Sequence, residues 1–150
     1  MVSALRRLGF DYVFDTDFAA DLTIMEEGTE LLRRLTRHLE GDREVQLPML
    51  TSCCPGWVNF FEHYFPDLKD IPSTARSPQQ MFGSIAKNYF AQKIGVDREQ
   101  MVVVSIMPCL AKKYECQRDE FSVDGNPDVD FSITTRELAH LIKQANLDLS

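Results

Sequence analysis

Short apolar runs alternate along the chain with longer stretches of helical periodicity, and this alternation predicts strands separated by helices. Runs typical of strands occupy Phe10–Thr16, Leu47–Ser52, Met101–Met107 and Val129–Thr134. The third run is apolar almost throughout, which favours a strand buried on both faces. Strands alternating with helices favour a parallel sheet with right-handed crossovers. The predicted fold class is therefore α/β, a three-layer lobe with about four parallel strands flanked by helices.

The longest predicted helix runs from Ala19 to about Glu40 and has two different sides. Its apolar side carries Leu22, Met25, Leu31, Leu32, Leu35 and Leu39. Glu27, Glu30 and Arg34 lie on the opposite side, where spacings of three and four residues make them neighbours. Taken alone, that polar side is typical of solvated surface charge. It can relay protons only if other parts of the protein cover it.

Three further helices are indicated by the residues at their ends. Pro55 fits the first position of one helix, because proline lacks the N–H that is unpaired there anyway. Ser77 is a capping residue in front of a second helix, which is expected to stop near Gly95. Thr134 and Glu137 form a capping box at the start of the last helix.

Composition narrows the functional classes. A chain of 150 residues is long enough to bury a core without disulfides, and 44% apolar with 26% charged residues is typical of a globular protein in water. The formal net charge of −7, without a basic patch, gives no indication of nucleic-acid binding. No apolar run approaches the ~20 residues of a membrane span, and the first residues lack the apolar core of a signal peptide. Four unevenly spaced cysteines do not resemble a secreted disulfide framework, which favours a reducing, cytoplasmic setting.

Three of the cysteines follow predicted strands. Cys53 and Cys54 come after the second strand, and Cys109 comes after the third. Because ligands bind at the carboxyl edge of parallel α/β sheets, these thiols are expected at one edge. Cys54 falls at the N-cap before Pro55, where amide donors and the helix dipole favour a thiolate. On spacing alone the cysteines could still be ordinary buried packing residues, since no CxxC pair occurs.

Two lysines and a fourth cysteine follow Cys109. The ammonium groups of Lys112 and Lys113 could lower the pKa of a nearby thiol and hold an anionic ligand, although adjacent lysines are usually solvated surface residues. Cys116 lies beyond the predicted strand edge and is expected to be a small packing residue.

Several segments resemble the iron-only ([FeFe]) hydrogenases. Thr51–Trp57 (TSCCPGW) and Met107–Glu115 (MPCLAKKYE) resemble two of the three signature segments of that family. Ser73–Gly83 (STARSPQQMFG) and Leu8–Leu31 also look like it, so the resemblance covers essentially the whole chain. It implies one lobe of a two-lobed catalytic domain whose reaction is 2H⁺ + 2e⁻ ⇌ H₂.

The resemblance implies a cofactor called the H-cluster, a 4Fe-4S cubane joined through one cysteine sulfur to a diiron unit that bears CO and cyanide. Carried over by position, it implies that Cys54 and Cys109 are cubane ligands. It implies that Cys53 is the thiol that passes a proton to the bridging amine of the diiron unit. It also implies that Lys112 hydrogen-bonds a cyanide on the distal iron.

Other pocket residues follow from the same resemblance. Ser77 and Pro78 would lie beside the other cyanide, and Met107 and Gln79 would line the diiron pocket. Leu50 stands where many members have phenylalanine before the threonine, which is a modest change in the pocket lining. The expected partners are the remaining lobe, a ferredoxin or similar electron carrier, and the reactants H₂ and protons.

A proton route is also implied by the resemblance. It would run from the surface through Arg34, Glu30, Ser73 and Glu27 to Cys53. The helical spacing agrees with part of this route, because Glu27, Glu30 and Arg34 share one helix side.

The chain departs from the family in what it lacks. A cubane needs four protein ligands, and two matched cysteines are present. The third signature segment, an upstream Pro-Ser segment and cysteine-rich accessory domains do not occur. Residues 1–150 are therefore expected to form a single partial domain, the N-terminal lobe of the H-cluster domain. Alone, it should hold no complete H-cluster and evolve no hydrogen.

Two alternatives remain. An iron–sulfur assembly or sensory relative would keep the fold and bind a cluster without hydrogen turnover. Against it, such a scaffold needs neither a proton-donor thiol like Cys53 nor a cyanide anchor like Lys112. The other alternative is a cluster-free folded lobe that only associates with its other half.

Overall fold

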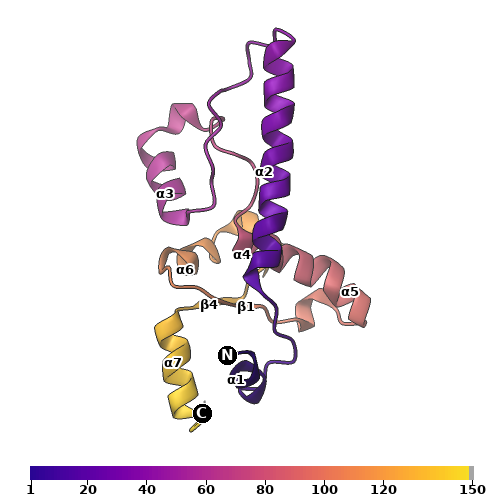
Figure 1. Cartoon of the computed structure of the whole chain (residues 1–150), viewed down its shortest axis with the longest axis vertical. Helices are drawn as coiled ribbons and strands as arrows, with labels where there is room; N and C mark the ends of the chain where they lie inside the picture. Colours follow the sequence, from indigo (N-terminus) through magenta and orange to yellow (C-terminus); the bar gives the residue numbers. More distant parts are fainter. Residues whose placement is uncertain (149–150) are drawn as a thin grey trace.

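The computed structural model of the chain describes residues 1–148 and places helices around a small parallel strand pair (Figure 1). The helices are α1 Val2–Arg7, α2 Thr16–Leu39, α3 Pro55–Tyr64, α4 Pro78–Ile85, α5 Ala91–Ile94, α6 Ala111–Glu115 and α7 Thr135–Gln144. The shorter turns are the 3-10 turns η1 Pro66–Leu68, η3 Arg98–Gln100 and η4 Asp119–Phe121, and the π-helical turn η2 Ala86–Phe90. The strands are β1 Val104–Ile106, β2 Ser122–Val123, β3 Asn126–Pro127 and β4 Phe131–Ile133.

β1 and β4 form a parallel pair at the centre of the fold, with Ser105 opposite Ser132 and Ile106 opposite Ile133. Because neighbouring strand residues point to opposite faces, the isoleucines lie on one face and the serines on the other. The isoleucine face packs against a cluster from α1 and α7, made of Ala4, Leu5, Leu138 and Ile142. Both serine hydroxyls contact Gln79 of α4. Helices therefore cover both faces of the pair, which confirms the α/β class and its three layers.

The expected number of four parallel strands is wrong, since among residues 1–148 only β1 and β4 form a parallel sheet. Phe10–Thr16 forms no strand. It lies across a cleft of about 830 Å³ from Met101–Met107, and both segments line this cleft. The rings of Tyr12 and Phe14 pack edge-on against Phe90, with centroids 5.0 and 5.1 Å away. Contacts between side chains, rather than a backbone ladder, therefore position this segment.

The second expected strand, Leu47–Ser52, is reduced to one parallel bridge between Leu50 and Pro72. Pro48 has no N–H to donate to a ladder. The Arg34 guanidinium also binds the carbonyl oxygens of residues 70–72, which limits further pairing. The third run is shorter than expected and not buried throughout, because Val102 is 63% exposed.

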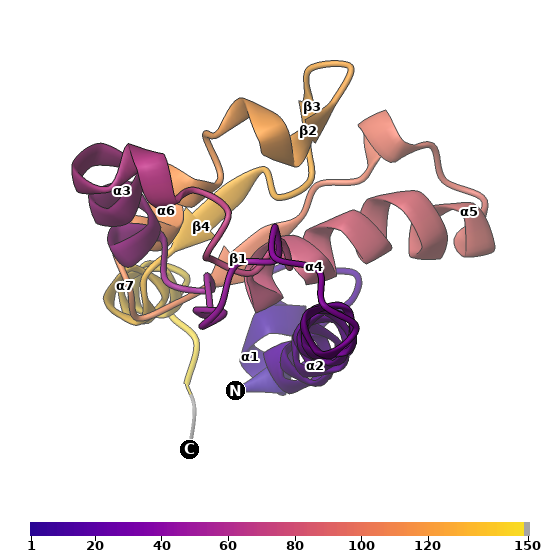
Figure 2. The same cartoon turned by 90° about the horizontal axis from the view of Figure 1, so that it is seen from above.

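An antiparallel hairpin, β2–β3, precedes β4 and was not expected from the sequence. At its tip Asp124 and Gly125 have φ of 52° and 80°, the backbone of a two-residue hairpin turn. The hairpin lies on the side of the molecule away from α1 and α2 (Figure 2). Lys87 of η2 contacts the segment between β3 and β4, where its Nζ pairs with the Asp130 carboxylate at 2.9 Å.

α2 turns its polar side, not its leucine side, toward the rest of the chain. Glu27, Glu30 and Arg34 are half-buried, whereas Leu32 is 67% and Leu39 is 84% exposed. The helix extends well beyond the β1–β4 layer, and the segment after it returns alongside (Figure 1). The side that the sequence alone marked as solvated is therefore the side that packs.

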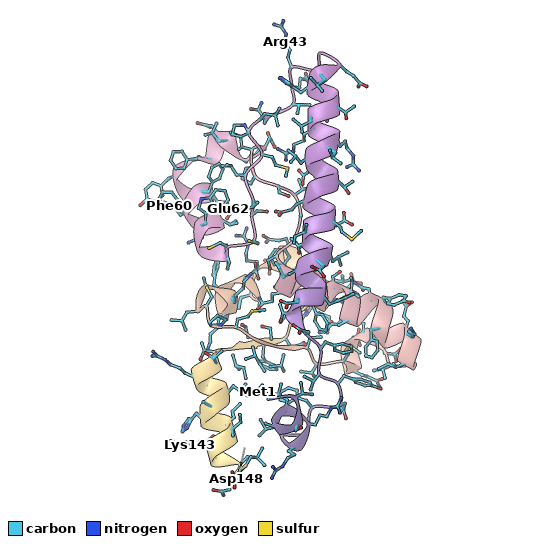
Figure 3. The ribbon with its side chains drawn as sticks, in the orientation of Figure 1. Met1, Arg43, Phe60, Glu62, Lys143 and Asp148 are labelled. Carbon is cyan, nitrogen blue, oxygen red and sulfur yellow. The ribbon has the colours of Figure 1, made fainter. Side chains whose placement is uncertain are left out.

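The helix starts predicted next to Pro55, Ser77 and Thr134 are confirmed, whereas α2 begins at Thr16, three residues before the predicted start at Ala19. α3 begins at Pro55 and α4 follows Ser77, whose hydroxyl accepts from the Gln80 amide. Thr134 and Glu137 form both hydrogen bonds of the capping box before α7. In the described chain, Arg43 marks the turn beyond α2, and Met1 and Asp148 lie at the opposite end (Figure 3). No helix of residues 1–148 is long and apolar enough to cross a membrane.

Candidate active site

Two segments that are far apart in the sequence meet beside α6. Cys53 and Cys54 precede α3, Cys109 follows β1, and α3 packs against α6. Figures 1 and 2 both show α3 and α6 as neighbours. The Lys112 ammonium donates a 3.0 Å hydrogen bond to the carbonyl oxygen of Cys53. This bond joins the TSCCPGW and MPCLAKKYE segments directly.

The three thiols that follow strand runs differ from the fourth. Cys53, Cys54 and Cys109 are exposed, whereas Cys116 is buried. Cys54 is the N-cap of α3, as expected, and its side chain makes no capping hydrogen bond. Its sulfur is therefore free to bind a ligand at the positive end of the helix.

Cys116 is a packing residue, as the sequence suggested. Its thiol donates to the carbonyl of Lys112 at 3.1 Å and joins the apolar cluster around Val129. Burial, together with the nearby Glu115 carboxylate, raises the pKa of the Cys116 thiol to about 11. It therefore stays a neutral thiol near pH 7, which suits packing and not nucleophilic or ligand chemistry.

A buried carboxylate connects the predicted pocket residues. Glu115 of α6 is 4% exposed, and its Oε2 accepts from the Ser77 hydroxyl at 2.9 Å and the Gln79 amide at 2.9 Å. Lys112 Nζ lies 3.1 and 3.2 Å from the two oxygens of the same carboxylate. Three of the residues that the resemblance assigned to cofactor contacts thus share one partner.

The other predicted pocket residues have different surroundings. Gln79 is 2% exposed, and its carbonyl oxygen accepts from Ser105 at 2.5 Å while its amide donates to Glu115. Its hydrogen bonds therefore hold α4 against β1 and α6. Pro78 and Met107 are half-buried.

The predicted proton-route residues of α2 lie against the segment that follows α3. Arg34 donates to Glu30 at 2.6 and 3.0 Å, and its other guanidinium N–H groups reach the carbonyls of Asp70, Ile71 and Pro72. With side-chain exposures of 13% and 14%, this ion pair is largely withdrawn from water.

Ser73 and Thr74 complete the surroundings of Glu30. The Ser73 hydroxyl donates to Oε2 of Glu30 at 2.7 Å, and the Thr74 amide donates to the same oxygen at 2.9 Å. Burial alone would raise the pKa of Glu30, but the hydrogen bonds from Ser73, Arg34 and Thr74 together lower it below its ordinary value. Glu30 also lines a surface cleft of about 380 Å³.

Glu27 stands one turn earlier on the same side of α2. Its Oε1 is buried and has no hydrogen-bond partner among residues 1–148. Native structures rarely leave such a group unpaired, so this oxygen marks a place where another polar group belongs. The structure thus brings Glu30, Arg34 and Ser73 into direct contact, while Glu27 makes no hydrogen bond to Ser73 or Cys53.

Sequence reasoning missed two participants, Glu115 and Thr74. Glu115 stands three residues after Lys112, a spacing that pairs side chains on one helix side, and this signal was available. Thr74 binds Glu30 partly through its backbone amide, which any residue would supply, so its side chain carried no comparable signal.

The donor set fits half of an iron–sulfur cubane. Among residues 1–148, no group of three or more His, Cys, Asp or Glu side chains is arranged to hold a metal ion. Cys54 and Cys109 offer two exposed thiols of the soft type that iron–sulfur clusters require, against the four ligands of a complete cubane. The arrangement is consistent with a site that needs ligands from other residues.

Comparison with known proteins places the chain beside hydrogenases. The family model described as iron only hydrogenase large subunit, C-terminal domain, matches residues 1–150. The chain is 72% identical over its whole length to the NADP-reducing hydrogenase subunit HndD of Solidesulfovibrio fructosivorans, covering 26% of that protein. It is 47% identical to the periplasmic [Fe] hydrogenase large subunit of Nitratidesulfovibrio vulgaris, covering all of this chain and 35% of that protein.

A solved structure that reports stepwise assembly of the [FeFe]-hydrogenase H-cluster in HydA(deltaEFG) matches with a TM-score of 0.93 and 52% identity. The match covers 99% of this chain and 36% of that one, so the chain spans about a third of its solved relative. The cytosolic iron-sulfur assembly component 3 of Bos taurus is also similar, with 38% identity over 154 residues, all of this chain and 32% of that protein.

Proposed function

The chain belongs to the iron-only hydrogenase large-subunit family, and from that premise we propose that it supplies one half of the H-cluster site of an [FeFe] hydrogenase. The observation that carries the proposal is the buried Lys112 ammonium, bound to the Cys53 carbonyl at 3.0 Å. This contact sets a cation beside a pair of exposed thiols, as an anionic iron–sulfur ligand requires.

The proposed roles divide the thiols. Cys54 and Cys109 would hold the cubane, and the remaining two ligands would come from the other lobe. When bound, the H-cluster supplies the metal site at which protons and electrons combine. Cys53 would hold the last proton before that site, and Lys112 would donate a hydrogen bond to a cyanide.

The proposed proton route begins at Arg34 and Glu30 and continues through Ser73 and Glu27 to Cys53. The 2.7 Å hydrogen bond from Ser73 to Glu30 supports its first half. The unpartnered Oε1 of Glu27 supports the second, because a buried carboxylate oxygen there can take part in a hydrogen-bonded chain that other groups complete.

The residues around the proposed diiron pocket would orient the cofactor and exclude water. Ser77 and Pro78 would lie beside one cyanide, and Met107 would line the pocket with Gln79. The contacts of Ser77 and Gln79 with Glu115 support a rigid wall at this point, since each side chain has little freedom to move.

A chimera tests this proposal. In it, the chain replaces the matching segment of HydA(deltaEFG), to which it aligns over 99% of its length. After diiron maturation in anoxia, the chimera should evolve hydrogen from reduced viologen. Cys53→Ala should lower turnover by about 10³-fold, the scale of a lost proton donor, and leave the electron paramagnetic resonance of the cubane intact.

Cys116→Ala is the matched control, because it removes a buried thiol to which the proposal gives no role as ligand or proton donor. It should keep most of the turnover. Equal losses in both variants, or a Cys53→Ala chimera with unchanged turnover, would contradict the role given to Cys53.

The isolated chain should be inactive, because two of the four cubane ligands are not in it. Hydrogen evolution is measured with reduced viologen after the same maturation. Robust turnover by the 150-residue chain alone would overturn this expectation. If the isolated chain is inactive, binds no cluster and still associates with the remaining lobe, this would support the alternative of a cluster-free folded lobe.

A second function, iron–sulfur cluster assembly without hydrogen turnover, is favoured by the 38% identity to the bovine assembly component. The two functions differ in whether the loaded chimera turns over hydrogen. A folded chimera that carries the cubane but shows neither CO and cyanide bands nor hydrogen evolution would favour the assembly function.

We also propose a cytoplasmic location and a ferredoxin-like electron carrier. A cytoplasmic site is supported by the four free cysteines, since a reducing compartment keeps thiols unpaired. One similar protein is named as periplasmic, so cell fractionation decides the point. A ferredoxin or similar carrier would deliver electrons, and reduction of the matured chimera by reduced ferredoxin tests that.

A further inference from the structure

We propose that Glu115 is a positioning residue that holds the Lys112 ammonium with one N–H group directed to an anionic ligand. The inference rests on the proposed function, because the ligand is the cyanide-bearing half of the H-cluster. It starts from the convergence of Ser77, Gln79 and Lys112 on one carboxylate that is 4% exposed.

The Lys112 ammonium has one donor more than its contacts within residues 1–148 use. A lysine ammonium has three N–H groups. One donates to the Cys53 carbonyl at 3.0 Å. Oε1 and Oε2 of Glu115 lie at nearly equal distances, 3.2 and 3.1 Å, so one N–H shared between them satisfies that contact. The third N–H has no acceptor among residues 1–148 and is left for a ligand.

The Lys112 side chain is flexible unless other groups hold it. Its four-carbon stem carries a mobile point charge, which loses conformational freedom when it is held. Glu115 stands three residues later on α6, a spacing that places both side chains on one helix side. Two fixed acceptors, the Cys53 carbonyl and the Glu115 carboxylate, therefore define the direction of the remaining N–H.

Glu115 links Lys112 of α6 to the start of α4. Oε2 of Glu115 also accepts from Ser77, the capping residue of α4, and from Gln79 in its first turn. α4 itself is packed closely against the chain before β4, where a Cβ at Gly83 would lie 2.6 Å from the Asp128 carbonyl oxygen. Because α4 is held in place in this way, Ser77 and Gln79 fix the position of the Glu115 carboxylate, and the carboxylate in turn fixes the Lys112 ammonium.

Amine labelling of the unmatured protein tests the inference without any cofactor. Lys112 is reacted with an acylating reagent, and its extent of modification is compared with that of Lys113 in the same peptide. Glu115→Gln should raise Lys112 labelling about tenfold, because it removes a hydrogen bond between charged groups. Lys87, whose side chain is 0% exposed in the separate network with Asp130, should stay protected and so reports an intact fold.

Glu120→Gln is the matched control, since it changes the same residue type in an exposed ion pair with Arg118. It should leave the ratio of Lys112 to Lys113 labelling unchanged. Glu115→Asp keeps the charge on a shorter stem and should give an intermediate ratio. The inference is overturned if Glu115→Gln leaves that ratio unchanged, or if Lys112 and Lys87 become reactive together.

The matured chimera gives a second readout. Glu115→Gln should shift an infrared cyanide band and lower hydrogen evolution about tenfold, whereas Glu120→Gln should do neither. An unmutated chimera without CO and cyanide bands would refute the proposed function. An active chimera in which Glu115→Gln and Glu120→Gln have the same spectrum would refute the role of Glu115 alone.

Discussion

Two carboxylates of this protein accept similar sets of hydrogen bonds but have different access to water. Glu30 accepts from Ser73, Thr74 and Arg34, and it lines a surface cleft. Glu115 accepts from Ser77, Gln79 and Lys112, and it is 4% exposed. A group that relays protons must exchange them with a neighbour that reaches solvent, whereas a group that positions others works best when sealed. The comparison supports the proposed roles, in which Glu30 transfers protons and Glu115 orients Lys112.

The largest expected effect comes from removing the relay carboxylate. Glu30→Gln keeps the size of the side chain but cannot carry a proton as a carboxyl group does. Hydrogen evolution by the chimera should fall about 10²-fold, more than the tenfold expected for Glu115→Gln. The two variants are compared by viologen-driven turnover, with Glu26→Gln as control, since Glu26 is an exposed glutamate one turn earlier on α2 that the proposed route does not use. Equal losses of turnover in Glu30→Gln and Glu26→Gln would contradict a proton-relay role for Glu30.

A smaller effect should separate structural support from transfer. Arg34→Ala removes the cation that pairs with the largely buried Glu30 carboxylate and takes one donor from each of three backbone carbonyls. The free energy of unfolding should fall by about 2–3 kcal/mol, below the full cost of a wholly buried pair because both side chains keep some exposure. Urea unfolding measures it.

Arg37→Ala provides the matched comparison for Arg34→Ala. Its ion pair with Asp42 lies on the same helix but is exposed, with 55% of the arginine side chain accessible. The expected loss is about 0.5 kcal/mol or less. If the two substitutions lower the free energy of unfolding equally, Arg34 does not hold the segment after α3 in place.

The smallest expected effect is on the pH dependence of stability. The folded-state pKa of Glu30 is lowered from 4.5, so the unfolded chain binds more protons in the interval just below that value. Glu30 therefore contributes stability that is fully present above 4.5 and is lost as the pH falls through its lowered folded-state pKa. Unfolding midpoints measured across this interval should fall less steeply in Glu30→Gln than in the unmutated chain. A steeper fall in the variant would reverse the sign of the proposed shift.

Local signals in the sequence predicted the helix ends well. Pro55, Ser77 and the Thr134–Glu137 capping box act within one helical turn, so their effect depends little on the rest of the fold. The number of strands could not be predicted in the same way, because a strand forms only when its backbone finds a partner. Phe10–Thr16 has a strand-like pattern yet lines a cleft instead.

The two sides of α2 show a second limit of sequence reasoning. Hydrophobic periodicity correctly separated an apolar side from a polar side of α2. It did not predict that the rest of this chain packs against the polar side. Leu32 is 67% exposed, while Arg34 is held by backbone carbonyls of residues 70–72. Tertiary contacts, which periodicity does not contain, decide that choice.

The candidate site was predictable where its residues follow strands or stand in the family segments. Cys54 is the expected cap, and Lys112 reaches the Cys53 segment. Glu115 was missed because its importance comes from Ser77 and Gln79, some 36–38 residues earlier in the chain. Such a convergence becomes visible only when α4 and α6 are placed side by side.

The infrared spectrum of the matured chimera tests the central claim most directly, namely that this chain supplies half of an H-cluster site. The account predicts bands from metal-bound CO and cyanide, and their loss when Cys54 and Cys109 are both replaced by alanine. A folded chimera without these bands, beside a solved relative that shows them after the same treatment, would contradict it.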